Sequence, residues 1–575
     1  MATFFQTTTA WIPGQILSKA QVPMAFKQAM ALHQRGQIPA AQILYERIIG
    51  VDQTHVGALQ MSGAAAAQSG HFDMAVQRLD QALAIVADKP DIHIQRAYAL
   101  QQLHRFTEAL VSYECALELQ PSHAETHNNR GVVLHALQRW EDALSAYDRA
   151  LELKPGYAQA HFNKGNALLA LKRRAEALEC LDAAIAVQPN YAKAYINRGV
   201  ALQELRRPQE ALESYEKAVA LQPYMPEAHV NRGWALQALC RLDESIAAYD
   251  KAIALRSDYA DAHLHKATAL LLKGHFSLGW RSYEWRWKTE DAKTRLRDFS
   301  TPQWTGTESL VGKTIFLHCE QGLGDVIQFC RYSSVLRRMG ARVILEVHRP
   351  LITLLQDLDG VDTCLVMGDA LPEFDYHCPL LSLPLALQTD LETIPIAPSY
   401  LNAKPDRIEY WRNRLGPKKC LRVGMVWSGN PAHAVDYNRS ISLSDWFSHV
   451  GLNVEWISLQ KEVRESDRSA LDTHSLRHFG AELQDMGDTA ALCKLMDVVV
   501  SVDTSVAHLS AALGCPTWIL LPKVPDWRWL LGRNDSPWYP SVRLYRQAVD
   551  GDWSEVFSRL CVDLAAIDGT SHRDV

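Results

Sequence analysis

The chain has 575 residues, of which 47% are apolar and 22% are charged, and its formal net charge is −6. This length predicts several domains, about three or four, and the composition is typical of an ordinary globular protein. The acidic balance argues against a general nucleic-acid-binding protein. We therefore expect no nucleic-acid partner, although a local basic groove would be compatible with this charge.

Cysteine usage and the apolar segments indicate a cytoplasmic protein. The 11 cysteines are an odd number, without a Cys-x-x-Cys pair or metal-ligand spacing, which predicts reduced thiols. Residues 1–14 have no charged segment ahead of an apolar core, so we predict no secretory leader. The long apolar segment Val498–Leu521 is interrupted by Asp503 and His508, so we predict no membrane span.

A period of 34 residues organises the first half of the chain. It is carried by Pro121, Pro155, Pro189 and Pro223, by Gly131, Gly165, Gly199 and Gly233, and by Ala116, Ala150, Ala184, Ala218 and Ala252. Each unit predicts two packed helices closed by a proline turn. The pattern resembles the tetratricopeptide repeat. This resemblance implies an α-solenoid of about eight repeats over residues 24–292, after an N-terminal segment of residues 1–23.

Asparagine recurs in the same register, two residues before each glycine. The column consists of Asn129, Asn163, Asn197 and Asn231. Asparagine is a poor helix former, and its amide both donates to and accepts from an extended peptide backbone. The column therefore predicts capture of an acceptor protein or peptide on the concave face, unless each amide only bonds neighbouring helices. It is similar to the asparagine ladder that holds acceptor polypeptide in O-linked N-acetylglucosamine transferases.

The last repeat changes character, because it carries Trp280, Trp285 and Trp287 within eight residues. Large aromatic side chains on a terminal helix predict packing against the next domain rather than ligand binding. Residues 293–312 then read as a turn-rich linker. A homo-oligomer is also compatible with the sequence, since solenoids commonly dimerise through convex faces.

Beyond residue 313, short apolar strands alternate with helices, which is the pattern of a doubly wound α/β sheet. The predicted strands of the first group are Thr314–His318, Val343–Val347 and Thr363–Val366, after which Phe374–Pro379 enters the crossover. Those of the second group are Arg422–Trp427, Val454–Leu459, Val498–Val502 and Thr517–Leu521. A Pro-rich connection and a helix at Asp406–Leu415 join the two groups. We predict two Rossmann-like lobes, residues 313–405 on the acceptor side and 406–575 on the donor side, as in GT-B glycosyltransferases.

The loop after the first of these strands is the centre of the second half. Gly322 and Gly324 allow a tight turn and close approach by a ligand, and Asp325 begins a helix that apolar spacing predicts over residues 326–339. A crevice at the carboxyl end of a strand is the usual ligand site of open α/β sheets. Alternatively, this is a glycine turn in which Asp325 only caps the helix.

Three stretches of the second lobe also follow strand ends. Ser428, Gly429 and Asn430 are placed for close approach to a donor, and Gln460 and Lys461 lie where base and ribose contacts commonly fall. The third stretch precedes an alanine-rich helix, whose exposed N–H groups suit a diphosphate. It contains Asp503, Thr504, Ser505 and His508, of which Asp503 is expected to orient the loop or bond the sugar.

In their order along the chain, Gly322-Leu-Gly-Asp325, Val426–Asn430 and Asp503–Pro516 resemble the inverting heptosyltransferases. With the repeats, the whole chain resembles bacterial proteins that join tetratricopeptide repeats to such a domain. The resemblance implies that Asp325 is the catalytic base, that Arg439 contacts the diphosphate and that His508 donates to the donor. Without the resemblance, Arg439 reads as a surface residue and His508 as a core residue. The solenoid replaces membrane-approach elements, which argues against a lipopolysaccharide acceptor.

Trp527 and Arg528 suit a donor as well, because tryptophan stacks on sugars and bases and arginine pairs with phosphate. Packing between lobes explains the tryptophans equally well. Inversion of this kind needs no metal or other cofactor, and the nucleotide sugar is a substrate. Asp357 and Asp359 imitate the metal-binding pair of the other glycosyltransferase fold, but they precede a turn and read as surface charge.

The sequence thus predicts a metal-independent, inverting glycosyltransferase that transfers a sugar from a nucleotide sugar to Ser, Thr or Asn of a protein recruited by the repeats. Two alternatives remain open. One is a non-catalytic repeat adaptor with a vestigial or sugar-nucleotide-sensing domain. The other is a transferase acting on a saccharide or lipid, in which the repeats serve only assembly.

Overall fold

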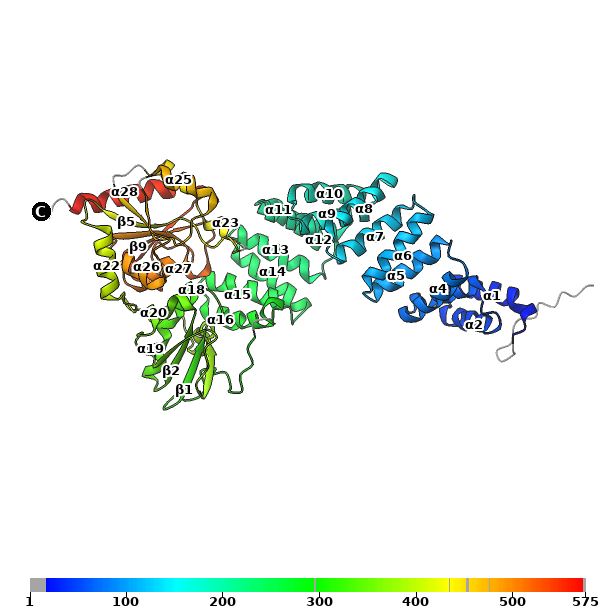
Figure 1. Cartoon of the computed structure of the whole chain (residues 1–575), viewed down its shortest axis with the longest axis horizontal. Helices are drawn as coiled ribbons and strands as arrows, with labels where there is room; N and C mark the ends of the chain where they lie inside the picture. The colour runs from blue at the N-terminus through cyan, green and yellow to red at the C-terminus, as the bar shows by residue number, and fades with distance from the viewer. Residues whose placement is uncertain (1–16, 294–295, 434, 451–453, 475, 572–575) are drawn as a thin grey trace, which may run out of the picture. The chain divides into compact units, whose positions relative to one another are not determined.

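The computed structural model describes residues 17–293, 296–433, 435–450, 454–474 and 476–571. The chain forms two compact units, which divide between Asn231 and Arg232, within one helix of the repeat region. The sequence places the end of the repeats at residue 292, whereas the last repeats lie in the same unit as the α/β part (Figure 1). The end of the repeats and the boundary between the two compact units therefore fall at different residues.

Antiparallel helix pairs build the first unit, as the 34-residue period predicts. Its helices are α1 (Val22–Gln34), α2 (Ile38–Val51), α3 (Val56–Gln68), α4 (Phe72–Ile85), α5 (Pro90–Gln102), α6 (Phe106–Leu119), α7 (Ala124–Ala136), α8 (Trp140–Leu153), α9 (Ala158–Ala170), α10 (Arg174–Val187), α11 (Ala192–Glu204) and α12 (Pro208–Leu221). The pattern continues through α13 (Pro226–Ala238), α14 (Leu242–Leu255), α15 (Ala260–Leu272) and the shortened α16 (Phe276–Tyr283). Sixteen helices thus alternate in pairs across the described part of the repeat region.

The repeating glycines fit the first helix of each pair against the second. A Cβ on Gly131 would lie 2.5 Å from the ring of Tyr147, and one on Gly233 would lie 2.6 Å from Tyr249. Both tyrosine rings are buried, so they have no free space to move into. The glycine column is therefore a packing requirement rather than a turn requirement.

A second column in the same 34-residue register has left-handed backbone. It occupies the turn inside each helix pair and consists of Gly36, Gly70, His104, Gln138, Lys172, Arg206, Cys240 and Gly274. Five of these eight positions carry side chains that disfavour positive φ. The turn geometry therefore recurs in all eight pairs even where the residue does not favour it.

The α/β part contains two separate, wholly parallel sheets. The first has the order β3-β2-β1-β4, with strands β1 (Thr314–His318), β2 (Arg342–Val347), β3 (Thr363–Val366) and β4 (Tyr376–Pro379). The second has the order β10-β9-β8-β5-β6-β7, with strands β5 (Arg422–Val426), β6 (Glu455–Ser458), β7 (Arg477–His478), β8 (Val498–Val502), β9 (Thr517–Leu521) and β10 (Val542–Arg546). Strands β5, β8 and β9 are buried throughout, as expected for parallel strands covered on both faces.

The other helices of this part precede, connect or follow these strands. They are α17 (Glu290–Lys293), α18 (Leu323–Phe329), α19 (Ser333–Arg338), α20 (Ile352–Leu355), α21 (Leu383–Ala386), α22 (Pro405–Leu415), α23 (Asp436–Arg439), α24 (Leu443–His449), α25 (Arg468–Thr473), α26 (Met486–Cys493), α27 (Ser505–Ala512) and α28 (Ser554–Ser571). None of the helices in the described ranges is long and apolar enough to cross a membrane.

One predicted helix differs from the structure, strands β7 and β10 were not predicted, and β4 lies in the segment predicted to enter the crossover. The single helix expected over residues 326–339 is broken into α18 and α19 by a 3-10 turn at Cys330–Tyr332. Arg331 in this turn is buried, and its guanidinium donates to the carbonyls of Gln328 and Trp538, each at 2.7 Å. The break places a cation in the core, which apolar spacing does not reveal.

The last repeat and both sheets share one continuous apolar core. Trp280 of α16 is buried there, where its indole N–H donates to the carbonyl of Thr389 at 3.1 Å. Its ring meets Trp527 edge-on at 5.2 Å and Phe329 at 6.4 Å. Trp280 therefore has the packing role that the sequence predicts for it.

We predict that Gly131→Ala destabilises the first unit, because its new methyl group overlaps the buried ring of Tyr147. Overpacking costs about 1–3 kcal/mol, of which better helix propensity restores up to about 1 kcal/mol. Gly156→Ala is the control, since nothing lies within 4 Å of a Cβ there. Thermal unfolding that is equal for both variants would contradict the packing role.

Candidate functional site

Two helix starts face each other where strands of the two sheets end. Helix α18 follows β1, α27 follows β8, and the two helices pack together. A Cβ on Gly324 would lie 3.1 Å from Cδ2 of His508 and 3.5 Å from Cα of Ser505. Glycine at this position therefore lets the two predicted motifs approach closely, which explains one of the two glycines in Gly322-Leu-Gly-Asp325.

Asp325 lies at this meeting point, and both of its oxygens are engaged. Oδ2 accepts the backbone N–H of Gly322 at 2.9 Å, which is the helix-capping bond that the sequence left as an alternative role. Oδ1 forms an ion pair with Arg528, which comes from the loop after β9. Only 17% of the Asp325 side chain and 10% of the Arg528 side chain are exposed, so this pair is buried where the two sheets meet.

Arg528 bonds to three side chains at this site. Besides Asp325, its guanidinium donates to Oε1 of Gln328 at 2.8 Å and to Oδ1 of Asp526 at 2.8 Å. Burial opposes its charge, but Asp526 and Asp325 outweigh that effect and raise the pKa of Arg528 above its ordinary value. The sequence predicts Arg528 as a phosphate contact and gives no sign of its bond to Asp325.

His508 is buried on α27, with its ring stacked on Trp529 at 5.1 Å. Nδ1 lies 2.9 Å from the hydroxyl of Tyr539, and Nε2 lies 3.9 Å from Oδ1 of Asp503. Burial, together with Arg528 and two further arginines, holds the pKa of His508 well below its ordinary value. The imidazole is therefore neutral at pH 7, and it lies in a positive field.

Asp503 and the two hydroxyl residues follow β8 directly. Burial and the nearby carboxylate of Asp526 raise the pKa of Asp503 to about 6. The hydroxyl of Thr504 lies 3.1 Å from that of Ser501, and Thr504 makes no side-chain capping bond to α27. Ser505 is the first residue of α27. The helix thus begins just after Asp503, and His508 lies in its first turn.

Arg439 connects the loop after β5 to this place. Its Nη1 donates to the carbonyl of Asp503 at 2.8 Å, and its Nε pairs with Asp436 at 3.2 Å. A Cβ on Gly429 would lie 2.6 Å from Nη2 of Arg439. Arg439 is therefore partly buried and links two loops. It is not the surface residue that the sequence would predict without the family resemblance.

The Gln460 side chain bonds to the backbone of the loop after β5. Its Oε1 accepts the backbone N–H groups of Trp427 and Ser428 at 2.8 and 2.9 Å, and its Nε2 donates to the carbonyl of Glu462 at 3.1 Å. Lys461 is exposed and donates to the carbonyl of Gln484. The Gln460 amide thus fixes the loop after β5, and a nucleotide contact by either residue stays a prediction.

The remaining donor candidates divide into exposed and packed residues. Asn430 is exposed, and its Oδ1 accepts the backbone N–H of Ala432 at 2.9 Å. Trp527 is buried against Trp280, with its ring 4.1 Å from the guanidinium of Arg528. Its contacts favour the packing alternative that the sequence left open.

The asparagine column falls on the first helix of successive pairs, as predicted. Asn163 is buried and donates to Oδ1 of Asn128 at 2.9 Å, and Asn197 donates to Asn166. Asn129 accepts from Asn128 at 3.2 Å and is half-buried, as is Asn231. Part of the column thus bonds between repeats, which is the alternative to peptide capture, while Asn129 and Asn231 keep partial exposure.

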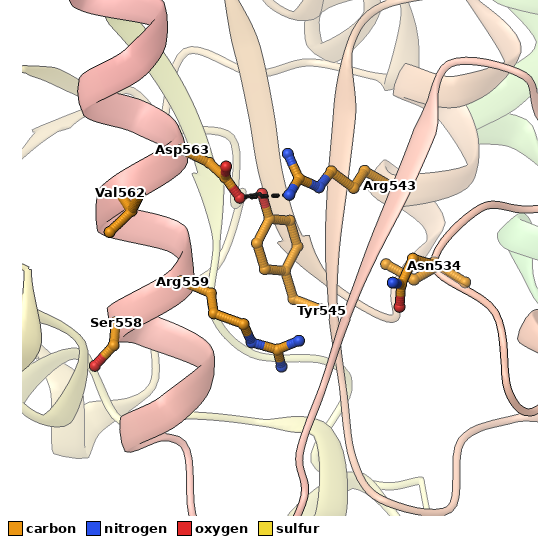
Figure 2. Close-up of a pocket in the computed structure, with 8 residues that line it drawn as sticks. Asn534, Arg543, Tyr545, Ser558, Arg559, Val562 and Asp563 are labelled. Carbon is orange, nitrogen blue, oxygen red and sulfur yellow. Dashed lines mark hydrogen bonds and ion pairs between the residues drawn. The ribbon is translucent and has the colours of Figure 1, made fainter.

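Two other features lie away from these motifs. A hollow of about 380 Å³ lies between β10 and α28 (Figure 2), where Asp563 pairs with Arg543 at 2.7 Å and accepts the Tyr545 hydroxyl at 2.8 Å. No predicted site residue lines it.

The Asp357 side chain is 77% exposed and pairs only loosely with Lys404, which fits surface charge. Within the described ranges, no cluster of three His, Cys, Asp or Glu side chains is arranged to hold a metal ion.

We predict that Arg528→Met destabilises the second unit by about 3–5 kcal/mol, because it leaves buried carboxylates without their cation. Arg533→Met is the matched control, since Arg533 pairs with Asp535, whose side chain is 71% exposed. Loss of such a surface pair costs about 0–1 kcal/mol. Chemical denaturation of both variants measures the difference, and similar losses would contradict the central place of Arg528.

We also predict that stability falls as the pH rises through about 6, because the folded state holds a proton on Asp503 more tightly than the unfolded chain does. The contribution is complete below the ordinary pKa of 3.8 and is lost above the raised one. Asp503→Asn should flatten this part of the stability profile. An unchanged slope between about pH 4 and 6 would contradict the assignment.

Comparison with known proteins identifies the repeats. Tetratricopeptide-repeat models match residues 94–158, 162–226 and 226–259. Protein FlbA of Caulobacter vibrioides is 24% identical over an alignment of 339 residues, which covers 52% of this chain and 54% of that protein. The chain therefore spans about half the length of this curated relative.

Solved repeat proteins resemble parts of the chain. A tetratricopeptide repeat protein from Parabacteroides merdae is 16% identical, with a TM-score of 0.37, covering 44% of this chain and 99% of that one. MamA from Desulfovibrio magneticus is 24% identical, with a TM-score of 0.29, covering 30% of this chain and 97% of that one. These scores are too low to carry an argument about the whole molecule. Together with the matched models, the helix pairs identify tetratricopeptide repeats from α1 to about residue 260.

Proposed function

We propose that this protein is an inverting, metal-independent glycosyltransferase of the GT-B, heptosyltransferase-like type, with a protein acceptor recruited by its repeats. The observation that carries the proposal is the meeting of α18 and α27. There the predicted base, Asp325, and the predicted diphosphate seat at Ser505 come together from sheets that are far apart in the sequence.

The fold supports this proposal. Two parallel sheets covered by helices, each with a glycine-containing or hydroxyl-containing loop at a strand end, suit a nucleotide sugar bound at the carboxyl ends of the strands. The eleven cysteines all lie in described residues and are free thiols, which is compatible with a cytoplasmic site of action.

The charges near α27 support an anionic donor. Arg528, Arg331 and Arg439 add to the effect of burial in lowering the pKa of His508, so three guanidinium groups lie near enough to α27 to act on it. Backbone N–H groups at a helix start add partial positive charge. A neutral His508 provides one N–H donor without adding another charge. This environment is suited to the growing charge on a departing nucleoside diphosphate.

Asp325 is the proposed base, and its pairing with Arg528 suggests how donor binding prepares it. A diphosphate competes for Arg528, because guanidinium forms strong bidentate bonds with phosphate oxygens. Release of Arg528 frees Oδ1 of Asp325. The carboxylate then takes the proton from the acceptor Ser, Thr or Asn as its oxygen or nitrogen bonds to the anomeric carbon. The bond from that carbon to the diphosphate breaks, and the nucleoside diphosphate leaves with the electron pair.

One observation favours the second candidate, a repeat adaptor whose α/β part only senses a sugar nucleotide. Both oxygens of Asp325 are occupied, and a carboxylate held by Gly322 and Arg528 is not free to act as a base. An adaptor and an enzyme differ in turnover, not in donor binding. The two candidates are therefore separable by measuring turnover in the wild-type protein.

We predict that a matching nucleotide sugar raises the unfolding temperature, since a ligand at a hundredfold its dissociation constant adds about 2.7 kcal/mol. With that donor, Asp325→Asn should lower sugar transfer or donor hydrolysis at least about a hundredfold, the usual scale for loss of a general base. The matched control is Asp535→Asn at the exposed Arg533 pair. Equal turnover by wild type and Asp325→Asn would remove Asp325 from the base role, and binding without turnover in wild type would favour the adaptor.

The acceptor half of the proposal has a separate test. Replacing Asn129, Asn163, Asn197 and Asn231 together by alanine should weaken binding of a polypeptide partner. Because Asn163 and Asn197 also bond between repeats, a small loss of stability is expected as well. The control is Asn128→Ala with Asn166→Ala, which removes both inter-repeat bonds without changing the column. Equal peptide binding by the fourfold variant and this control would contradict peptide capture.

A further inference from the structure

Tyr539, between β9 and β10, is buried beside His508 and has no part in the steps described above. Its hydroxyl lies 2.9 Å from Nδ1 of His508, an ordinary hydrogen-bond length. Either group could be the donor, because a tyrosine hydroxyl both donates and accepts, and a neutral imidazole carries its proton on one nitrogen or the other. The direction of this bond therefore decides which nitrogen of His508 presents an N–H to the site.

The other polar neighbours of the Tyr539 hydroxyl are donors. Burial raises the pKa of Tyr539, and Arg331 and Tyr400 oppose this rise because both act as donors toward its oxygen. Among the described residues, Nδ1 of His508 is the one acceptor that the Tyr539 proton reaches. Buried hydroxyl groups are nearly always hydrogen-bonded, so Tyr539 is the donor in this pair. The proton of the neutral imidazole is then on Nε2.

Arg331, the buried cation in the turn between α18 and α19, favours the same direction. Its guanidinium donates to two backbone carbonyls and, at 2.9 Å, to the hydroxyl of Tyr400, and none of these acceptors is charged. The guanidinium also lies 4.6 Å from the centre of the Tyr539 ring. A hydroxyl dipole orients in the field of a nearby charge, so Tyr539 presents its oxygen to Arg331 and its proton to His508.

The second nitrogen of His508, Nε2, faces the place where α18 and α27 meet. A Cβ on Gly324 would lie 3.8 Å from it. Oδ1 of Asp503 lies 3.9 Å away, which is too far for a hydrogen bond, so the Nε2–H remains available to a ligand. With the proton on Nδ1 instead, Nε2 would present a lone pair and would repel an anionic oxygen. The bond from Tyr539 therefore decides whether this edge of the ring attracts a phosphate.

We propose that Tyr539 is a positioning residue, which donates to Nδ1 of His508 and thereby holds the Nε2–H toward the diphosphate of the donor at the start of α27. This inference rests on the proposed function for the identity of the ligand. The direction of the bond between the two side chains does not depend on sugar transfer.

The direction of the bond is measurable in the full chain with histidine labelled with ¹⁵N at Nδ1 alone. Solid-state NMR of the sedimented protein at pH 8 gives one signal per histidine, and His508→Gln removes that of His508. We expect a pyridine-like chemical shift, displaced by a hydrogen bond from that of a free ring nitrogen. A pyrrole-like shift means that Nδ1 carries the proton, and it would overturn the proposal.

Tyr539→Phe removes the hydroxyl and keeps the ring that packs on Arg331 and His508. The Nδ1 signal should then move to the shift of an unbonded ring nitrogen or become pyrrole-like. Tyr545→Phe is the matched control, because it removes a buried hydroxyl that donates to Asp563 away from the site. A signal that stays in place in Tyr539→Phe would overturn the proposal. If that variant does not fold, the wild-type spectrum still decides the direction.

The effect on the ligand is measured by calorimetry with inorganic pyrophosphate. Tyr539→Phe should weaken its binding about three- to tenfold, the scale of one lost hydrogen bond. In the His508→Gln background, an amide N–H can take the Nε2 position without help from Tyr539, so Tyr539→Phe should have little further effect. Equal losses in both backgrounds would mean that Tyr539 acts only through packing, and the proposal would fall.

Failure of this inference and failure of the proposed function have different signatures. If the wild type binds neither pyrophosphate nor any nucleotide sugar, the proposed donor site falls, and the positioning role falls with it. If pyrophosphate binds and the Nδ1 signal of His508 is pyrrole-like, the proposed function stands and only the role of Tyr539 falls.

Discussion

The arrangement of the second unit depends on one buried ion pair, between Arg528 and Asp325. Each residue comes from a different sheet, and each has further bonds that fix it: Asp325 to the backbone of its own loop, Arg528 to Gln328 and Asp526. A charge pair out of water is stable only when its remaining hydrogen-bonding capacity is used. The pair therefore links the two sheets at the place where the predicted motifs converge. It also makes this place sensitive to any anion that competes for the guanidinium.

Much of the fold was predictable because its determinants are local and periodic. The 34-residue register includes glycines that contact a large side chain of the second helix, such as Tyr147 at Gly131 and Leu181 at Gly165. Parallel strands such as β8 are buried and so read as continuous apolar runs. What the sequence did not reveal is long-range or polar. Strand β10 alternates apolar residues with arginines, β7 has only two residues, and the break at Arg331 depends on carbonyls of Gln328 and Trp538.

The candidate site shows the same division. Loop positions such as Gly324 and Asp503 follow from strand ends and helix starts, which sequence patterns locate well. The partners of these residues do not, because the bond from Arg439 to the Asp503 carbonyl and the bond from Arg528 to Asp325 join segments 64 and 203 residues apart. Gln460 is a further example of a partner that the sequence does not reveal. Its position at a strand end suggests a ligand contact, and in the structure its amide oxygen accepts two backbone N–H groups of the segment that follows β5.

The column of left-handed turn residues has a consequence for the stability of the repeat region. Glycine occupies the column in the first two pairs and in the last one, whereas Lys172 and four other side chains occupy the pairs between them. Each non-glycine residue in that conformation stores about 1 kcal/mol or more of strain. Each middle repeat is thus less stable, by about that amount, than it would be with glycine at this turn. Single exchanges to or from glycine at the turn of a helix pair can therefore raise or lower the stability of that repeat.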